Sequence, residues 1–282
     1  MQYTIQNETM KIVVSSTGAE LISAVANGTE RIWQNPTGEW AGHAPLLFPY
    51  AGRIAVAVNG QKYPVQMHGV ARRAEFSLSS QTENSLTFTL YSSAETKKIF
   101  PYDFIFSVTY SIKGNALTVD YAVENPSEET LYFAGGCHEA YALESDVDGY
   151  EIEFEKEEDL TLWLHNDDAK LTGETRSLGK MKTMPLDKEG LSNSYTYIFK
   201  DILSRSVTLK QKGGKSLVKV TFPEYPHLMF WHAHGAHYIC IEPWLNLPDF
   251  DGKEWVEFSQ KQGVRALAPH AKTVISHTIE YL

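Results

Sequence analysis

Apolar and polar residues alternate along much of the chain. An alternation with a period of two runs through residues 85–90, 104–112 and 117–123. Residues that alternate in this way point to opposite faces of a β-strand, so that one face packs on a core. The pattern therefore predicts β-strands over these three segments.

Glycine-containing turns join neighbouring strands into hairpins. Gly114-Asn115 separates two of the alternating segments, and Gly213-Gly214 separates residues 207–211 from residues 216–222. Both pairs suit the positive φ angles of a tight turn. Further strands are expected at 10–15, 130–137, 150–155, 227–232, 236–242 and 273–281.

Helices are scarce in the sequence. Residues 159–164 could form one helical turn, but no long stretch carries apolar residues at the i, i+3, i+4, i+7 spacing of an amphipathic helix. Many short strands with turns between them indicate an all-β protein, a large antiparallel β-sandwich or barrel. Because no internal repeat or linker-like segment interrupts them, residues 1–282 are expected to form a single domain.

Composition and charge exclude several classes of protein. The chain has 282 residues, 43% of them hydrophobic, and a formal net charge of −10. An acidic chain is a poor partner for the phosphates of nucleic acid, and no apolar run is long enough to predict a membrane span. The first ten residues lack the basic start and apolar core of a secretory signal. We therefore expect a cytoplasmic protein without nucleic-acid or membrane partners.

The two cysteines, Cys137 and Cys240, lie far apart in the sequence and in apolar surroundings. A disulfide framework would need more cysteines, and a CxxC metal site would need the two close together. We expect both cysteines to be buried and reduced, as is usual in the cytoplasm.

Polar side chains lie inside apolar sequence at four places, and the first two contain Arg53 and His68. Arg53 follows Gly52, and His68 precedes Gly69. A buried guanidinium needs a carboxylate or a polar ligand, so Arg53 belongs either to a structural salt bridge or to a binding site. A lone histidine such as His68 is more often a loop or core residue than a catalytic one.

The other two places contain His138 and Glu242. His138 follows Gly135-Gly136, a pair that suits a bend in a strand or the close approach of a ligand. Glu242 follows an apolar Ile-Cys-Ile run, and burial there would raise the pKa of its carboxyl group toward the range of a general base. Trp244, two residues on, could stack on the apolar face of a sugar.

A histidine cluster offers a rival site. His232, His234 and His237 are spaced similarly to zinc ligands of the metallo-β-lactamase-type hydrolases, but Ala236 replaces the aspartate of that motif. The spacing found in cupins also fails, because Glu242 lies too far along the chain. His232 and His234 would share one face of a strand, where a metal ion could bind adventitiously. We expect no catalytic metal there.

Taken in order, these places resemble the aldose 1-epimerase family, and more narrowly its short bacterial branch associated with lactose operons. The similar segments are 42–53, 66–72, 95–102, 240–249 and 267–269, so the likeness extends over most of the chain. The resemblance implies a single large antiparallel β-sandwich. It also implies a mutarotase, an isomerase that interconverts the α and β anomers of a free hexose without a cofactor.

The resemblance also implies a role for each candidate residue. Glu242 would be the general base and His138 the general acid. The sugar-binding residues would be His68, Arg53, Trp231 and Trp244. The only expected partner is a monosaccharide, and the chain would be a monomer or a homodimer.

Acid–base chemistry alone suffices for this reaction. The C1 hydroxyl loses a proton while the ring oxygen gains one, the ring opens, and the steps run backward on the other face. Glu242 as carboxylate and His138 as imidazolium would stabilise each other's charged forms. Arg53 keeps its charge at any working pH and could hold sugar hydroxyls without exchanging protons.

Two departures from the family bear on activity. The short branch usually has a proline where this chain has Glu139, which would place a charge beside His138 at the rim of the site. Larger family members carry an aspartate between the acid histidine and the terminal glutamate, and residues 192–195 offer no clear equivalent. A non-catalytic carbohydrate-binding or sensing protein is therefore the alternative. A phosphosugar epimerase is a third possibility, for which Arg72 or Arg73 could bind the phosphate.

Overall fold

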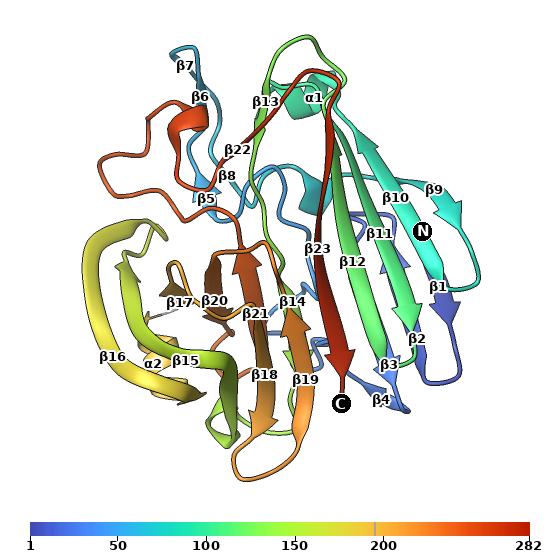
Figure 1. The fold of residues 1–282 in the computed structure, drawn as a ribbon, viewed down its shortest axis with the longest axis vertical. Helices are drawn as coiled ribbons and strands as arrows, with labels where there is room; N and C mark the ends of the chain where they lie inside the picture. Colours follow the sequence, from blue (N-terminus) through green and yellow to red (C-terminus); the bar gives the residue numbers. More distant parts are fainter. Residues whose placement is uncertain (195) are drawn as a thin grey trace.

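The structure is a computed structural model that describes residues 1–194 and 196–282, without the side chains of residues 192–194. Over these residues the chain consists mainly of antiparallel strands, and its helices are short (Figure 1). The prediction of an all-β, antiparallel fold is confirmed.

One large sheet contains most of the strands. They are β9 (Ser77–Gln81), β10 (Ser85–Tyr91), β11 (Ile105–Lys113), β12 (Ala116–Glu124), β14 (Glu139–Ala142), β15 (Tyr150–His165), β16 (Leu171–Pro185), β17 (Thr196–Phe199), β18 (Ser206–Gln211), β19 (Ser216–Thr221), β20 (His227–Trp231), β21 (Tyr238–Trp244) and β23 (Lys272–Tyr281). Over the described residues their spatial order is β14-β21-β20-β17-β15-β18-β19-β23-β12-β11-β10-β9, and β16 pairs with β15.

The remaining strands form smaller sheets. A four-stranded sheet contains β1 (Gln2–Gln6), β2 (Met10–Ser15), β3 (Leu21–Ala26) and β4 (Thr29–Glu30). The two-stranded pairs are β5 (Arg53–Ile54) with β8 (Gln66–Met67), β6 (Ala57–Val58) with β7 (Gln61–Lys62), and β13 (Leu131–Phe133) with β22 (Arg265–Leu267). The helical segments are α1 (Ala94–Lys97), α2 (Lys188–Ser194), η1 (Ala71–Arg73), η2 (Val147–Gly149) and η3 (Phe258–Gln260).

The four-stranded sheet packs face to face on the part of the large sheet that contains β10 and β11, which makes the fold a sandwich. The ring of Tyr3 meets the ring of Phe88 edge-on at 5.4 Å between centroids. The hydroxyl of Tyr110 on β11 donates a hydrogen bond to the carbonyl oxygen of Ala19 at 2.7 Å. The layers hold together because the inward residues of each strand are apolar, as the alternation in the sequence predicts.

The predicted hairpins are present. β11 and β12 pair with Lys113 opposite Ala116, so Gly114-Asn115 is the turn between them. β18 and β19 pair across the turn that contains Gly213. Strands also occupy the other expected segments, although β13 is shorter than residues 130–137 and β15 is much longer than residues 150–155.

The helical turn expected at residues 159–164 is wrong, because these residues form the second half of β15. Leu160 and Leu162 are buried and alternate with the more exposed Asp159 and Thr161, which is strand periodicity. The charged run before them hides the continuity of the strand, and the pairing of β15 with β16 shifts register between Glu153 and Glu158. Such an irregularity is a β-bulge, which leaves extra residues unpaired.

Residues 232–237 do not form a strand, contrary to the expectation for His232 and His234. β20 ends at Trp231 and β21 begins at Tyr238, so the intervening residues make the connection between two antiparallel neighbours. The two histidines therefore do not share a strand face. Among the described residues, no helix is long and apolar enough to cross a membrane.

β23 connects the two arms of the large sheet, one running from β12 to β9 and the other from β19 to β14. It pairs with β12 on one side and with β19 on the other. Over its second half every other residue is buried, and the buried residues, which share one face, include Ile275, His277 and Ile279. His277 is a histidine in an otherwise apolar row, and its side chain contacts the segment that precedes β14.

Candidate active site

A cavity of about 440 Å³ opens among the ends of several strands. Its volume lies in the range typical of small-molecule sites. The wall comes from β8, β17, β20, β21 and the turn between β15 and β16. Five of the six site residues expected from the sequence line it, namely His68, His138, Trp231, Glu242 and Trp244. Arg53 is not among the lining residues.

His138 and Glu242 meet in this cavity because of strand register. β14 and β21 are antiparallel with Glu139 opposite Ile241, which brings the residue before β14 next to Glu242. The Nε2 atom of His138 lies 3.5 Å from the Oε2 atom of Glu242. The two side chains are only 8% and 2% exposed, respectively. Two groups about a hundred positions apart in the sequence thus form one buried acid–base pair.

Gly135 and Gly136 permit the close approach that this arrangement needs. A Cβ atom on Gly136 would lie 2.6 Å from Cδ1 of Trp244 and 2.9 Å from the carbonyl oxygen of Pro243. A Cβ atom on Gly135 would lie 2.5 Å from the carbonyl oxygen of Leu47. Side chains cannot be accommodated at such distances, so the glycine pair brings His138 against β21.

Burial sets the protonation of the pair in the absence of a sugar. It raises the pKa of Glu242 well above the usual range, an effect that the neighbouring indole of Trp244 opposes only in part. Burial also lowers the pKa of His138 to about 3. The mutual stabilisation of charged forms expected from the sequence is therefore outweighed by desolvation. The pair holds one proton, and that proton rests on the carboxyl group.

His68 is held in a single tautomer by the backbone of Gly52. Its Nδ1 atom accepts a hydrogen bond from the Gly52 N–H at 3.0 Å, and the backbone N–H of His68 donates to the Gly52 carbonyl at 2.8 Å. Burial, followed by the charges of His138 and Arg72, lowers the pKa of His68 well below the usual value. The ring is therefore neutral, and its proton sits on Nε2, where it can be donated to a ligand.

Three indoles surround the acid–base pair. Trp40 stacks on the imidazole of His138 with ring centroids 5.3 Å apart, and Trp231 meets that imidazole edge-on at 5.8 Å. Trp244 lies 5.8 Å from the ring of His68. Indole faces suit the C–H face of a pyranose, while the N–H can reach a hydroxyl. The sequence predicted the last two tryptophans but not Trp40.

The structure places the three candidate arginines in different surroundings. Arg53 is 48% exposed at its side chain, and its Nη1 atom lies 3.8 Å from Oδ1 of Asp168. It is next in the chain to Gly52, which lines the cavity. Arg72 is a lining residue itself, and burial lowers the pKa of its guanidinium. Arg73 lines a separate surface groove instead.

The turn between β15 and β16 supplies polar groups that the sequence did not reveal. Asn166 and Asp167 line the cavity, and the Oδ1 atom of Asn166 accepts hydrogen bonds from the N–H groups of Asp168 and Lys170, each at 3.1 Å. Asp167 thus adds an exposed acidic residue to the wall, from a position between His138 and Glu242 in the chain. The side chains of residues 192–195, where such an aspartate was sought, lie outside the described residues.

Glu139 does not lie at the rim of the cavity, as the sequence had suggested, but points into the core. It is 4% exposed, and its Oε1 atom lies 2.7 Å from Nε2 of His277. Alternation explains the difference, because residues on either side of His138 point to the opposite face of the segment. Cys137 and Cys240 are buried and unpaired, as expected.

Two groups of three described residues could offer ligands to a metal ion: Cys137 with Glu139 and His277, and His138 with Cys240 and Glu242. In the first group His277 presents opposite ring nitrogens to its two partners. The second group shares its imidazole and carboxylate with the acid–base pair and offers a Cys/His/Glu donor set that suits zinc.

The histidine cluster at residues 232–237 forms no such group within the described chain. His232 is buried, whereas His237 is half exposed and lies 3.2 Å from Oδ1 of Asp146.

Comparison with known proteins agrees with this geometry. The model of the aldose 1-epimerase family matches residues 1–250 of the chain. The chain belongs to the aldose 1-epimerase family. The expectation raised by the sequence motifs is therefore confirmed.

Several relatives of this aldose 1-epimerase family member are similar over nearly their whole length. The plasmid and chromosomal forms of Protein LacX from Lactococcus lactis subsp. lactis are each 29% identical over 266 residues, 88% of both chains. A galactose mutarotase related enzyme from Lactobacillus acidophilus has 28% identity and a TM-score of 0.91, covering 100% of this chain and 97% of its own. A galactose mutarotase-like protein from Lactobacillus casei ATCC 334 has 26% identity and a TM-score of 0.92, with 100% of both chains covered.

The lining residues that sequence reasoning missed come mostly from turns. Trp40 precedes the similar segment 42–53, and Met67 lies within the similar segment 66–72, so their neighbourhood was identified without their roles. For Asn166 and Asp167 the signal was weak, because the hairpin that carries them contains a charged, irregular strand.

Proposed function

We propose that this member of the aldose 1-epimerase family is a mutarotase, an isomerase that acts on a free aldose. The observation that carries the proposal is the 3.5 Å approach of His138 Nε2 to Glu242 Oε2 in a cavity walled by indoles. The pair lies on the floor of a space large enough for a monosaccharide, and acid–base chemistry needs no cofactor.

In the proposed mechanism the pair exchanges its single proton with the sugar. The shared proton first passes from Glu242 to His138, which leaves a carboxylate beside an imidazolium. Ring opening transfers the O1 proton to Glu242 while His138 gives its proton to O5, so the C1–O5 bond breaks and a C1 carbonyl forms. Rotation about C1–C2 turns the other face of the aldehyde toward O5. Ring closure then returns a proton from Glu242 to O1 and takes the O5 proton back to His138. Both protonation states of the pair are therefore used in every cycle.

The other lining residues would bind and orient the sugar. The Nε2–H group of His68 can donate to a hydroxyl, because Nδ1 is already occupied by Gly52. Asp167 and Arg72 offer a carboxylate and a guanidinium from opposite parts of the chain. Trp231 and Trp244 provide apolar faces for stacking. Orientation of this kind keeps the reacting oxygens within reach of the pair.

The test is substitution of the carboxyl group. Glu242→Gln keeps the shape of the side chain but cannot exchange a proton, so accelerated interconversion of anomers should fall by about 10²-fold or more. The rate is followed by polarimetry on fresh α-anomer, with the uncatalysed rate subtracted. Glu39→Gln, on an exposed loop, is the control that should retain the wild-type rate. A Glu242→Gln protein that is folded and as fast as wild type would eliminate this mechanism.

The same measurement separates the alternative of a non-catalytic sugar-binding protein. Such a protein would quench tryptophan fluorescence on adding a monosaccharide, because the indoles line the cavity, yet it would not speed anomer exchange. Sugar binding without acceleration in the wild type selects that alternative.

A phosphorylated substrate is a second candidate, and the position of Arg72 favours it. The guanidinium lies in the cavity wall, where it could bind a phosphate group bidentately. Comparing an aldose with its 6-phosphate distinguishes the two: Arg72→Gln should raise the KM of the phosphorylated sugar by about 10-fold and leave that of the free sugar nearly unchanged. Equal effects on both sugars would exclude a role in phosphate recognition.

We also propose a cytoplasmic location. Both described cysteines are buried and unpaired, which suits a reducing compartment.

A further inference from the structure

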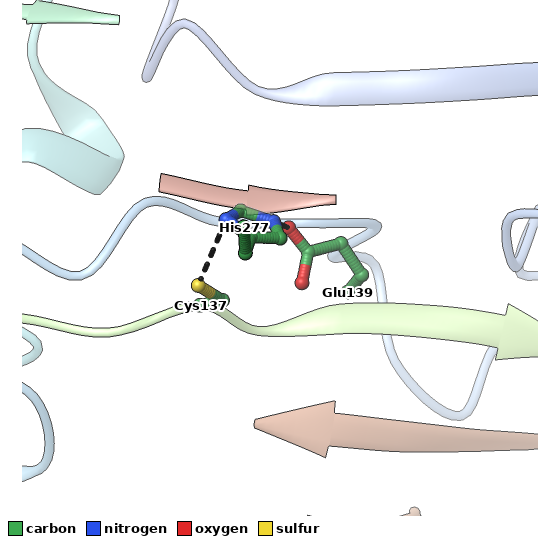
Figure 2. A group of neighbouring side chains, drawn as sticks. All are labelled: Cys137, Glu139 and His277. Atoms are coloured by element: carbon green, nitrogen blue, oxygen red, sulfur yellow. Dashed lines mark hydrogen bonds and ion pairs between the residues drawn. The ribbon is translucent and has the colours of Figure 1, made fainter. Parts of the chain in front are cut away.

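Behind the acid–base pair lies a second group of polar side chains that the proposed mechanism does not use. It consists of Cys137, Glu139 and His277 and is shown in Figure 2. The Nδ1 atom of His277 lies 3.2 Å from the Sγ atom of Cys137, and its Nε2 atom lies 2.7 Å from Oε1 of Glu139. All three are buried, with exposed fractions of at most 4%.

Two members of the group flank His138 in the chain. Cys137 and Glu139 are the residues immediately before and after it, and both side chains lie on the side of the segment that faces His277 (Figure 2). His138 lines the cavity, whereas Cys137 and Glu139 are not among the lining residues. A single imidazole from β23 contacts both of them. The two contacts therefore fix the backbone on each side of His138, and with it the direction in which that side chain projects.

The protonation of the group makes these contacts strong. Burial disfavours the imidazolium, but the interactions with Cys137 and Glu139 outweigh burial and raise the pKa of His277 well above the usual range. Burial also raises the pKa of the Cys137 thiol, an effect that the neighbouring His277 opposes in part. His277 is then a cation that donates one N–H to the sulfur and the other to the Glu139 carboxylate, and the latter is a charge-assisted hydrogen bond.

We propose that His277, with Cys137 and Glu139, is a buried clamp that positions His138 for proton exchange with Glu242 and the sugar. His277 is a positioning residue, because it contacts neither the cavity nor Glu242. The proposal rests on the proposed mutarotase function for its kinetic consequence, but the clamp itself is a geometric claim about His138.

A packing role alone would leave this arrangement unexplained. The neighbours of His277 on the same face of β23 are Ile275 and Ile279, so an apolar side chain would suit the row. Burying an ion pair in such surroundings is rarely the most stable choice. The imidazole of His277 meets the ring of Tyr121 edge-on at 5.7 Å, which holds the ring in the orientation that reaches both partners.

The experiment compares variants of the clamp. His277→Phe keeps a ring but removes both hydrogen bonds, and kcat should fall by about 10²-fold with KM within about 3-fold of wild type, because misplacing a reacting group by about 1 Å costs that much. Glu139→Gln still accepts a hydrogen bond from Nε2 and should retain most of the activity, whereas Glu139→Leu should resemble His277→Phe. A merely structural role would not produce this order of kcat values at constant KM.

The matched control is His227→Gln. His227 is another buried histidine beside a carboxylate, with its Nδ1 atom 3.5 Å from Oδ1 of Asp201, and it does not line the cavity. It should lose stability without a selective loss of kcat. A folded His277→Phe protein with wild-type kcat would overturn the proposal. If that variant fails to fold, wild-type kcat in Glu139→Leu would overturn it instead.

A readout independent of catalysis distinguishes failure of the clamp from failure of the proposed function. Side-chain ¹⁵N NMR identifies the His138 imidazole by comparison with His138→Gln. The His138 signals should shift in His277→Phe and Glu139→Leu but not in His227→Gln. If the wild type does not accelerate anomer exchange and the His138 signals still shift, the mutarotase function fails and the clamp stands. Unchanged His138 signals in the folded clamp variants would remove the clamp.

Discussion

At His68 the backbone adopts a left-handed conformation, with φ of 63°, that few non-glycine residues accept. The neighbouring Gly69 has φ of 70°, and a Cβ atom there would lie 2.3 Å from the carbonyl oxygen of Phe48. This conformation lets the imidazole receive the N–H of Gly52 and direct its other nitrogen to the cavity. Local backbone strain of this kind is common where side chains must be held for function.

The protonation of His138 and Glu242 predicts an unusual pH profile. Because burial lowers the pKa of His138 to about 3, kcat/KM should not fall as the pH drops through 6.5, the ordinary value for histidine. On the alkaline side the rate should fall once Glu242 loses the shared proton, at a pH well above its ordinary pKa. The pKa values read from the acidic and alkaline sides of this profile belong to the coupled pair rather than to either residue alone. The profile is measured by polarimetry in buffers that are not themselves catalysts.

An acidic limb centred near pH 6.5 would show instead that His138 exchanges its proton as an ordinary, solvated histidine. Electrostatic interactions with Cys240, Glu139, His68 and Arg72 also act on this site. The same profile in His68→Gln measures the contribution of His68.

Arg53 gives a second test at the residue scale. If it turns toward a bound sugar, as the sequence motif implies, Arg53→Ala should raise KM by about 10-fold, since hydrogen bonds from charged groups are strong. Asp168→Ala removes only the partner of its exposed ion pair and should leave KM unchanged and stability within about 1 kcal/mol. Steady-state kinetics of both variants decide, and equal KM values in the two would confine Arg53 to the surface ion pair.

At the scale of elements, the junction between β13 and β14 shows how a short segment fixes a site. Gly136→Ala should destabilise the protein by about 1–3 kcal/mol and lower activity, because the new methyl group meets Trp244 and the Pro243 carbonyl. Gly214→Ala is the control, since its nearest neighbours are atoms of the flexible Gln211 side chain. Urea unfolding with the two variants side by side measures the difference. Equal stabilities of the two variants would mean that β21 can shift to accommodate the new methyl group.

The elements also show what the sequence could and could not predict. Strands with strict alternation, such as β10, β11, β12 and β23, were found because one face of each is buried. β16 was missed because most of it is exposed, so burial imposes no pattern on it. The helical turn proposed within β15 was wrong because a charged run and a bulge interrupt the alternation there.

The candidate site divides in the same way. His138, Glu242, His68, Trp231 and Trp244 lie on or beside strands within segments that resemble the family, and all of them line the cavity. Trp40, Asn166 and Asp167 lie in loops and turns, where position depends on tertiary packing rather than on local pattern. The inward direction of Glu139 depends on His277, which is 138 residues away, and no local feature of the sequence reveals that pairing.

At the scale of the molecule, we propose that residues 1–282 fold as one domain, because β23 joins the arm that contains β12 to the arm that contains β19. Two buried histidines should each lower its stability as the pH drops from about 6.5 toward 4. Burial lowers the pKa values of His138, to about 3, and of His227, to about 4, so the unfolded chain binds these protons first. At pH 5 each group should cost at most about 2 kcal/mol relative to neutral pH.

The sign is opposite for His277 and Glu242, whose raised pKa values contribute stability at low pH that is lost as the pH rises through their folded-state values. Denaturant unfolding at pH 7.5 and pH 5, followed by tryptophan fluorescence and by circular dichroism, tests both points. Coincident transitions are expected for one domain. Two separated transitions would contradict it, and a His227→Gln variant whose stability changes with pH as that of the wild type does would contradict the assignment of His227 as a neutral buried histidine.

The central place of β23 has a consequence for synthesis and quality control. A nascent chain that has not yet delivered this strand leaves β12 and β19 with open hydrogen-bonding edges in the middle of the sheet. Open edges recruit strands from other molecules, so fragments that stop short of residue 272 should aggregate or be degraded rather than survive as partly active species. Because the same strand carries His277, such a fragment would also lack the residue proposed to position the acid histidine. The site would therefore become active only after β23 has joined the sheet.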